Sequence, residues 1–300
     1  MSRSITIQSH AKINLILRVG PPISDGYHPI CSWMHAIDLS DQITIELLNS
    51  NQQPHQQSEF NIHWDTGQPV QWPTQSDLVH QAHAVFERLL DRPIPVHINI
   101  SKSIPAGGGL GGGSSNAATT LMILNELTNA GLNQDQLRTL GHELGTDIPY
   151  FINLESFHAQ APPPPAVVSG IGDRIDRTEP TSSDLTLMIP NFGCPTPKVY
   201  AVFDRMENQQ PSQLDVSSVR AVAAKGTLSQ TTLTNDLRLP ARSAVPELDQ
   251  TITALQSIGL SPHLSGSGST MFLIGHLDQS AIEQISRACP TLRIISTQLI

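Results

Sequence analysis

The sequence PAGGGLGGGSSNAAT at residues 105–119 places six glycines in the seven positions 107–113. Each glycine costs the folded chain roughly 0.5–1 kcal/mol relative to alanine, because it loses more backbone freedom on folding. A strand pattern, VHINIS, precedes this run. Apolar residues at helical spacing follow it, with Ala117, Leu121 and Leu124 on one face. The run is therefore predicted to be a loop that joins a strand to a helix.

Such a loop has the chemistry of a polyphosphate cradle. A helix N-terminus leaves its first backbone N–H groups without intrahelical partners and carries partial positive charge. Glycine lets a phosphate chain approach those groups closely. Ser114, Ser115 and Asn116 add hydroxyl and amide donors at the expected first turn. Because the sequence has only four lysines, backbone dipoles would supply much of the attraction.

Two other glycine motifs share this outline. Gly107, Gly109 and Gly112 satisfy G-x-G-x-x-G, but a dinucleotide fold also needs an acidic residue about 20 positions later, after the next strand. This sequence predicts a helix there. The P-loop pattern G-x-x-x-x-G-K-[ST] fails because Gly113 stands where its lysine must be. A flexible tether is a third alternative, although six glycines between a strand and a strong helix pattern would be unusual for one.

Two polar features could act on a phosphoryl group. AKINLIL, residues 11–17, alternates as a strand does and places Lys12 and Asn14 together on one face. Asp147, in LGTDIPYF, lies on a tight connection, where the ordinary role is a turn or capping residue. Beside Lys12 it would supply a carboxylate that accepts a hydroxyl proton, near positive charge for the migrating group.

Two further loops are candidates for ligand contacts. SDGYHPI carries Tyr27 and His28 after a turn; an aromatic ring there could stack on a nucleobase while polar groups read its edge. The alternative is a plain surface turn. HLSGSGST, residues 263–270, is a second small-residue loop, and Gly266 and Gly268 would let it pack against another backbone or a phosphate.

Composition narrows the class of protein. The 300 residues carry a net charge of -9, which argues against nucleic acid or an anionic membrane as the main partner. The three cysteines are far apart and form no CxxC pair, as expected for free thiols in a cytoplasmic protein. No apolar run approaches the roughly 18 residues of a membrane span. HELG at His142 lacks the second histidine of a zinc site, since Thr146 stands there, and no structural metal is expected.

The remaining patterns predict an α+β protein of two lobes. The expected strands are residues 4–8, 11–17, 41–48, 96–101, 185–190, 271–275 and 292–296. The expected helices are residues 76–90, 114–131 ending near Gly131, 133–144 with Asn133 as N-cap and Gly145 as stop, 243–259 and 280–288. Three polar or proline-rich segments are expected to be loops: residues 49–58, 161–166 and 207–213.

Together these motifs resemble those of the GHMP kinases. AKINLIL and DGYH near the start, the glycine run with LGTDIPYF in the middle, and LSGSGST near the end share the order and spacing of that superfamily. The resemblance implies a two-lobed GHMP kinase fold with the active site in the cleft between lobes. It also implies an ATP-binding, catalytic N-terminal domain at residues 1–178 and a C-terminal domain at residues 179–300 that contributes to substrate binding.

The pairing of AKINL with DGYH is similar to the pairing found in certain members of this superfamily. Those members phosphorylate the 2-hydroxyl of 4-diphosphocytidyl-2-C-methyl-D-erythritol in the non-mevalonate route to isoprenoid precursors. For such an enzyme the resemblance implies ATP as donor and Mg²⁺ with it, to neutralise the β- and γ-phosphates. No acidic Mg²⁺ ligand is assigned. Neither the sequence nor the resemblance gives an oligomeric state.

The same resemblance assigns roles to residues. Asp147 matches the catalytic base, and Lys12 matches the partner that orients this carboxylate and stabilises charge on the phosphoryl group. On the substrate side, Asn14 matches a contact to the methylerythritol portion, Tyr27 and His28 the cytidine-binding pair, and Thr196 and Tyr200 further contacts, with Tyr200 facing the cytosine. The positions that match the ATP site are Lys102, Pro105, Ala106, Gly107, Gly108, Gly109, Leu110, Gly111, Gly112, Gly113, Ser114, Ser115 and Asn116.

Three alternatives stay open. A homoserine- or mevalonate-type kinase would share the fold, but its substrate carries no base for Tyr27 and His28 to bind. A non-catalytic nucleotide-binding protein would have no chemical need for both Lys12 and Asp147. A dinucleotide oxidoreductase is supported only by the weak glycine pattern.

Overall fold

The computed structural model describes residues 3–24, 26–48, 57–207 and 214–300. The chain forms two compact units, each assembled from several segments. The first unit comprises Met1–Ala11, Leu39–Ile104 and Gly111–Pro163, and the second comprises Lys12–Asp38, Pro105–Leu110 and Pro164–Ile300. Two long strands, β1 and β2, contribute residues to both units. The domain boundary expected at residue 178 stays a prediction.

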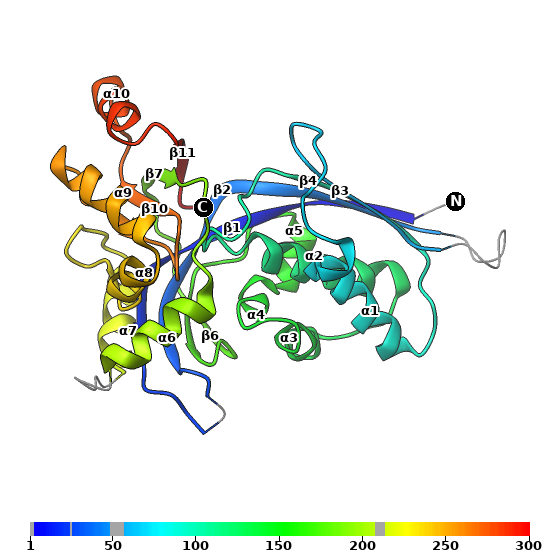
Figure 1. Ribbon diagram of the computed structural model, residues 1–300. Helices are drawn as coiled ribbons and strands as arrows, with labels where there is room; N and C mark the ends of the chain where they lie inside the picture. The colour runs from blue at the N-terminus through cyan, green and yellow to red at the C-terminus, as the bar shows by residue number, and fades with distance from the viewer. Residues whose placement is uncertain (1–2, 25, 49–56, 208–213) are drawn as a thin grey trace. The chain divides into compact units, whose positions relative to one another are not determined.

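The first unit is a sheet with helices on one of its faces (Figure 1). Its elements are β1 (Arg3–Val19) and β2 (Ile30–Leu47), both shared with the second unit, β3 (Glu59–Trp64), the 3-10 turn η1 (Thr74–Ser76), α1 (Leu78–Leu90), β4 (Val96–Lys102), α2 (Gly112–Thr128), α3 (Gln134–His142), α4 (Ile148–Phe151) and α5 (Leu154–Ala159). The strand order is β3-β4-β2-β1; β4 is antiparallel to β2 and parallel to β3.

Alternation of side chains explains why β4 and the end of β2 form the middle of this sheet. In β4 the side chains of Val96, Ile98 and Ile100 are buried, and the same parity puts Lys102 on the core face. In β2 the corresponding residues are Ile43 and Ile45, and Asp41 shares their face. Two opposite charges thus stand at core positions of neighbouring strands.

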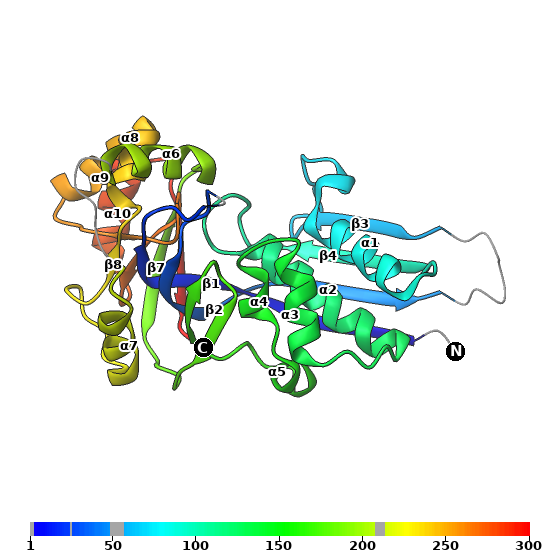
Figure 2. The same ribbon diagram turned by 90° about the horizontal axis from the view of Figure 1, so that it is seen from below.

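The second unit contains a four-stranded sheet of order β11-β7-β10-β9 and a set of helices. Its remaining elements are β5 (Ala166–Gly170), β6 (Arg174–Arg177), β7 (Asp184–Ile189), α6 (Thr196–Glu207), α7 (Val216–Lys225), β8 (Thr234–Asn235), α8 (Arg238–Ala244), α9 (Pro246–Ser257), β9 (His263–Leu264), β10 (Met271–Ile274), α10 (Gln279–Ala288) and β11 (Arg293–Gln298). Apolar residues of α6, α8, α9 and α10 share one core with Met188, Met271 and Leu273 of the sheet, so these helices cover one of its faces (Figure 2).

The predicted α+β class and most predicted elements are confirmed. The strands lie within β1, β2, β4, β7, β10 and β11, and the helices correspond to α1, α2, α3, α9 and α10. Asn133 caps α3 as predicted: it forms a reciprocal capping box with Gln136. The parts of the expected loops at 49–56 and 208–213 lie outside the described residues, as does Asp25 in the turn before Tyr27.

Three details differ from expectation. Residues 4–8 and 11–17 belong to one continuous strand, β1, and its residues 11–17 are buried on both faces. Helix α2 ends at Thr128 because Asn129 adopts the left-handed conformation and caps it, so Gly131 lies beyond the stop. Helix α3 ends at His142, before the expected Leu144.

All three cysteines are buried and free. Burial raises the pKa of the Cys31 and Cys194 thiols to about 11, so both stay protonated near neutral pH. Within the described ranges, no helix has the length and apolar character that a membrane-spanning segment requires.

Candidate active site

The glycine run falls into two halves, one in each unit. The first half, Pro105–Leu110, belongs to the second unit and rests on the small-residue loop at residues 264–270. The backbone N–H of Thr270 donates to Gly108 O at 3.1 Å, and the Ser265 hydroxyl donates to Gly109 O at 3.0 Å. This confirms the prediction that the second loop packs against another backbone.

Two glycines of the first half are required by this packing. A Cβ on Gly109, whose φ is +77°, would overlap the carbonyl oxygen of Ser265. A Cβ on Gly108 would lie 2.6 Å from the Thr270 hydroxyl. Gly107 has a φ of +69° with no atom in the way, so only its left-handed conformation favours glycine.

Lys12 and Asn14 meet the first half of the run. The Lys12 ammonium, 3% exposed, donates to Asn14 Oδ1 at 2.7 Å and to Gly109 O at 3.1 Å. Asn14 in turn donates from Nδ2 to the Ser32 hydroxyl at 2.8 Å. The predicted pair is therefore a buried polar network, and it holds a positive charge against a carbonyl of the glycine loop.

The second half of the run starts helix α2 in the first unit. Gly111 is the N-cap residue with a φ of 71° and offers no side-chain cap, so the first-turn N–H groups of α2 receive no side-chain oxygen from it. A Cβ on Gly112 would lie 2.7 Å from Ile104 Cγ2, which explains a glycine there. The Ser115 hydroxyl lies 2.7 Å from that of Ser9 on β1.

Lys102 and Asn116 are held by a residue that sequence reasoning missed. Asp41 is fully buried, and its carboxylate accepts from Lys102 Nζ at 2.6 Å and from Asn116 Nδ2 at 2.8 Å. Gln42 pairs with Ser101, so Asp41 and Lys102 are next in register on adjacent strands. The signal was present in the sequence, since both charges occupy apolar positions of an alternating strand.

Asp147 is the N-cap residue of the short helix α4 in the first unit. Its side chain makes no capping hydrogen bond to that helix. The carboxylate therefore does not cap α4, which was one of the two ordinary roles expected for it. Because Lys12 belongs to the other unit, the predicted proximity of the two side chains stays a prediction.

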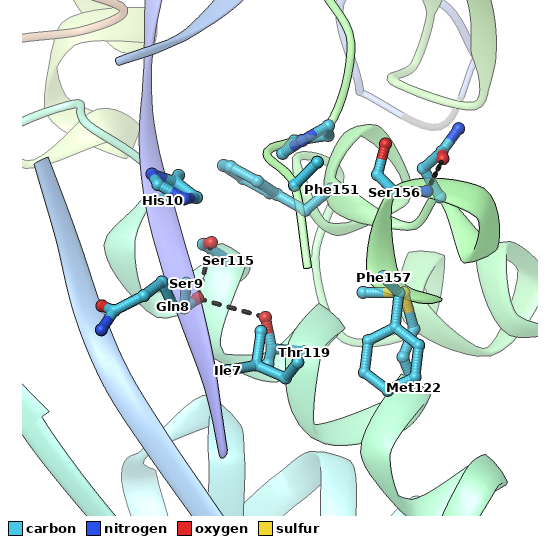
Figure 3. A pocket seen from close by; sticks show the side chains of 13 residues that line it. Ile7, Gln8, Ser9, His10, Ser115, Thr119, Met122, Phe151, Ser156 and Phe157 are labelled. Carbon is cyan, nitrogen blue, oxygen red and sulfur yellow. Dashed lines mark hydrogen bonds between the residues drawn. The ribbon is translucent and has the colours of Figure 1, made fainter. Parts of the chain in front are cut away.

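A small pocket of the first unit lies beside the first turn of α2 (Figure 3). One wall is polar: Ser9 Oγ contacts the hydroxyls of Ser115 and Thr119. The other wall contains Phe151 and Phe157. Of the predicted site residues only Ser115 lines this pocket, and its hydroxyl is already engaged with Ser9.

The predicted cytidine-binding residues lie in the second unit. His28 is buried; its Nδ1 lies 2.8 Å from Gly20 O and its Nε2 lies 3.0 Å from Asp204 Oδ1. Nδ1 is thus hydrogen-bonded to a backbone carbonyl, whereas Nε2 lies within ion-pair distance of Asp204 without hydrogen-bond geometry. The Tyr200 ring lies 5.2 Å from that of His28, centroid to centroid, at 41°.

Tyr27 and Thr196 differ in exposure and contacts. Tyr27 is 58% exposed, a large aromatic surface open to a stacking partner. The Thr196 hydroxyl, at the start of α6, lies 2.9 Å from that of Ser267. Thr196 therefore connects α6 to the same loop that supports the glycine run.

Comparison with known proteins first identifies the class of protein to which this chain is similar. Residues 77–153, which include the whole glycine run and Asp147, match the family described as the GHMP kinases N terminal domain. The fold agrees: a crystal structure of L. major mevalonate kinase in complex with R-mevalonate has a TM-score of 0.66 over 99% of this chain and 96% of that one. At 14% identity this likeness concerns the fold alone.

Closer relatives define the family. The chain is 30% identical to the 4-diphosphocytidyl-2-C-methyl-D-erythritol kinase of Paenarthrobacter aurescens, over 93% of this chain and 88% of that protein. It is 32% identical to the chloroplastic enzyme of that name from Mentha piperita, but the match spans 64% of that longer protein. A crystal structure of 4-(cytidine 5'-diphospho)-2C-methyl-D-erythritol kinase has a TM-score of 0.70 at 26% identity, covering 98% of this chain and 99% of that one.

The chain belongs to the 4-diphosphocytidyl-2-C-methyl-D-erythritol kinase family of the GHMP kinases. Membership of a kinase family implies the use of ATP as phosphoryl donor.

Proposed function

We propose that this protein transfers the γ-phosphoryl group of ATP to the 2-hydroxyl of 4-diphosphocytidyl-2-C-methyl-D-erythritol. The observation that carries the proposal is the buried Lys12 ammonium, which donates a hydrogen bond to Gly109 O in the glycine loop. Burial of an ammonium costs desolvation free energy that an apolar residue would avoid, and its place against the glycine loop favours a role in stabilising charge there. The names of the relatives supply the substrate.

In the proposed reaction the Asp147 carboxylate accepts the proton of the substrate hydroxyl as its oxygen attacks the γ-phosphorus. The bond between that phosphorus and the β,γ-bridging oxygen breaks, and ADP leaves with the electron pair. Lys12 stabilises the negative charge on the transferring group. General-base catalysis of this kind typically contributes about 10²–10⁴ in rate.

The glycine run would bind the phosphates of ATP through backbone N–H groups at the start of α2. Mg²⁺ would accompany ATP and supply charge neutralisation. Among the residues that the structure describes, no group of three or more His, Cys, Asp or Glu side chains could hold a metal ion. Phosphate oxygens and water would therefore provide most of its ligands.

The second unit would bind the acceptor. Tyr27 presents an exposed ring and Tyr200 a ring beside His28, which suits two faces of a cytosine. Asn14 would contact the methylerythritol portion and Thr196 another part of the substrate. The hydrogen bond between His28 Nδ1 and Gly20 O would fix the orientation of that imidazole, with Asp204 beside Nε2.

The test is ADP release from ATP and Mg²⁺ with four acceptors: the cytidyl alcohol, mevalonate, homoserine and galactose. We expect turnover with the cytidyl alcohol alone. Asp147→Asn should lower kcat by about 10²–10⁴ and leave ATP binding unchanged. The matched control is Asp135→Asn, the same substitution at a side chain that is 92% exposed, which should leave both unchanged.

Other outcomes separate the alternatives. Turnover with another acceptor would keep the fold and the roles of Lys12 and Asp147 but would reject the cytosine site. ATP binding without any turnover would favour a non-catalytic nucleotide-binding protein.

A further inference from the structure

We infer that Asp41 is a positioning residue for the nucleotide site, because its carboxylate fixes both ends of the glycine loop. This inference rests on the proposed function in one respect, namely that the loop binds the phosphates of ATP. Asp41 touches none of the expected ligand atoms. It acts through the residues that it holds.

The carboxylate of Asp41 is fully used. Oδ1 accepts from the backbone N–H groups of Ser103 at 2.7 Å and Ile104 at 2.8 Å. Oδ2 accepts from Lys102 Nζ at 2.6 Å and Asn116 Nδ2 at 2.8 Å. A carboxylate has about four acceptor sites, so four donors leave none for a ligand. Asp41 is 0% exposed, and a buried charge persists only with such partners.

These four donors lie on both sides of the loop. Lys102, Ser103 and Ile104 end β4 and lead into the run. Asn116 lies in the first turns of α2, just after the run. Ile104 also packs where a Cβ of Gly112 would be. One side chain therefore sets the distance between the strand end and the helix start, and with it the direction of the first N–H groups of α2.

The Asn116 side chain is the group that Asp41 orients toward a bound ligand. Asn116 is 2% exposed, and its Nδ2 is committed to Asp41. Its Oδ1 is buried and has no hydrogen-bond partner within the described part of the chain. Because Asp41 fixes which way the amide points, it also fixes this acceptor for a donor on a bound ligand.

Charge explains why Asp41 and Lys102 occur together. A lone buried carboxylate at the start of α2 would repel polyphosphate and weaken the positive end of the helix. The Lys102 ammonium, 4% exposed, neutralises it at 2.6 Å. The pair thus contributes hydrogen bonds to the loop without adding net negative charge. On this view Lys102 affects ATP through Asp41, whereas a direct ligand would act on the phosphates itself.

The test measures the Kd of ATP by calorimetry without acceptor, for wild type, Asp41→Asn, Lys102→Met and the double variant. In Asp41→Asn the new amide N–H₂ faces Lys102 Nζ and Asn116 Nδ2, so we expect Kd to rise about tenfold or more, a loss typical of an unsatisfied buried donor. Lys102→Met should weaken binding similarly, because it leaves the carboxylate unpaired. In the double variant the unpaired Lys102 cation is gone while the new amide still faces Asn116 Nδ2, so Kd should stay above the wild-type value but be no higher than in Asp41→Asn.

The matched control is Thr186→Val, which removes a buried hydrogen bond to Gly275 O in the sheet of the second unit. It should lower Tm without changing Kd, which separates positioning from general stability. If the double variant binds more weakly than Asp41→Asn, Lys102 acts on the ligand directly and the inference is overturned. If Asp41→Asn does not fold, the double variant, which carries no unpaired buried charge, still decides the question: ATP binding as tight as in the wild type would overturn the inference.

Two results concern the wild type. If it binds ATP and Asp41→Asn binds equally well, the inference alone fails. If the wild type binds no ATP, the proposed function fails and the inference with it. Kinetics provide a second readout: Asp41→Asn should raise KM for ATP while KM for the acceptor stays the same.

Discussion

The two halves of the glycine run contain the same residue for different physical reasons. In the first half, glycine is needed because another backbone occupies the space of a side chain: Ser265 lies against Gly109 and Thr270 against Gly108. In the second half, which begins a helix, Gly112 leaves room for Ile104 Cγ2, but a Cβ at Gly113 would meet only an ordinary contact with Leu78. The sequence GGGLGGG therefore combines a packing requirement with a requirement for exposed backbone.

The comparison matters for function because packing requires glycine at Gly108, Gly109 and Gly112 but not at Gly113. In the first half, glycine supports the carbonyl of Gly109 that receives the Lys12 ammonium. In the second half, Gly113 is exposed and makes no close contact. Its lack of a side chain is better explained by a ligand that approaches the helix N-terminus.

The largest effect is expected for Gly109→Ala. The substitution combines a left-handed backbone, which costs about 1–2 kcal/mol, with an overlap against the Ser265 carbonyl, for which overpacking costs about 1–3 kcal/mol. Urea unfolding should show a loss of about 3 kcal/mol. Gly107→Ala is the matched control, since its φ is also positive but its surroundings are open. It should lose only the cost of the left-handed backbone, about 1–2 kcal/mol. Equal losses for both would contradict the packing argument.

A smaller loss is expected for Gly108→Ala, and it should be reversible. Gly108 has no positive φ, so the cost comes from the 2.6 Å approach of the new Cβ to Thr270 Oγ1. We expect about 1–3 kcal/mol of destabilisation. Adding Thr270→Ala removes that oxygen and should recover part of the loss in a double-mutant cycle. Strict additivity of the two substitutions would show that the two residues do not meet.

Acid should weaken the region that supports the first half. His263 begins the strand that leads into the supporting loop, and burial, aided by Arg238, lowers its pKa to about 4. Burial likewise lowers the pKa of His35. In the unfolded chain both protonate near 6.5, so the unfolded state binds more protons below that pH and stability falls as pH drops from about 6.5 toward 4.

Unfolding free energies at pH 7.5 and pH 5 measure this loss. His263→Gln should reduce the difference between the two values. An unchanged difference would show that His263 does not contribute.

Much of the fold could be predicted because its signals are local. VHINIS alternates and becomes β4, and Asn133 with Gln136 forms the expected capping box. Helix α2 was expected to have one apolar face, yet it is buried almost all round. The break at Asn129 was missed because asparagine is a weaker left-handed signal than Gly131 two positions later.

The site was only partly predictable because its contacts join distant parts of the chain. The residue types at Lys12, Asp147 and the glycine run indicated phosphoryl transfer, and their roles remain predictions. The hydrogen bond between Ser265 and Gly109 spans 156 positions, and the approach of His28 to Asp204 depends on how α6 packs, so no local pattern encodes either. Asp41 is the exception: a charge at a buried position of an alternating strand calls for an opposite charge on its neighbour.

The smallest stability effect, and the most informative for the comparison, is expected for Gly113→Ala. A Cβ there would meet Leu78 Cδ1 at an ordinary 3.5 Å, and alanine favours a helix over glycine by up to about 1 kcal/mol. Stability should stay the same or rise slightly, whereas the methyl group would stand where phosphates approach the helix N-terminus, so KM for ATP should rise. A loss of stability would show that packing demands this glycine, as it does at Gly109. An unchanged KM would place the phosphates elsewhere along the run, away from the exposed surface at Gly113.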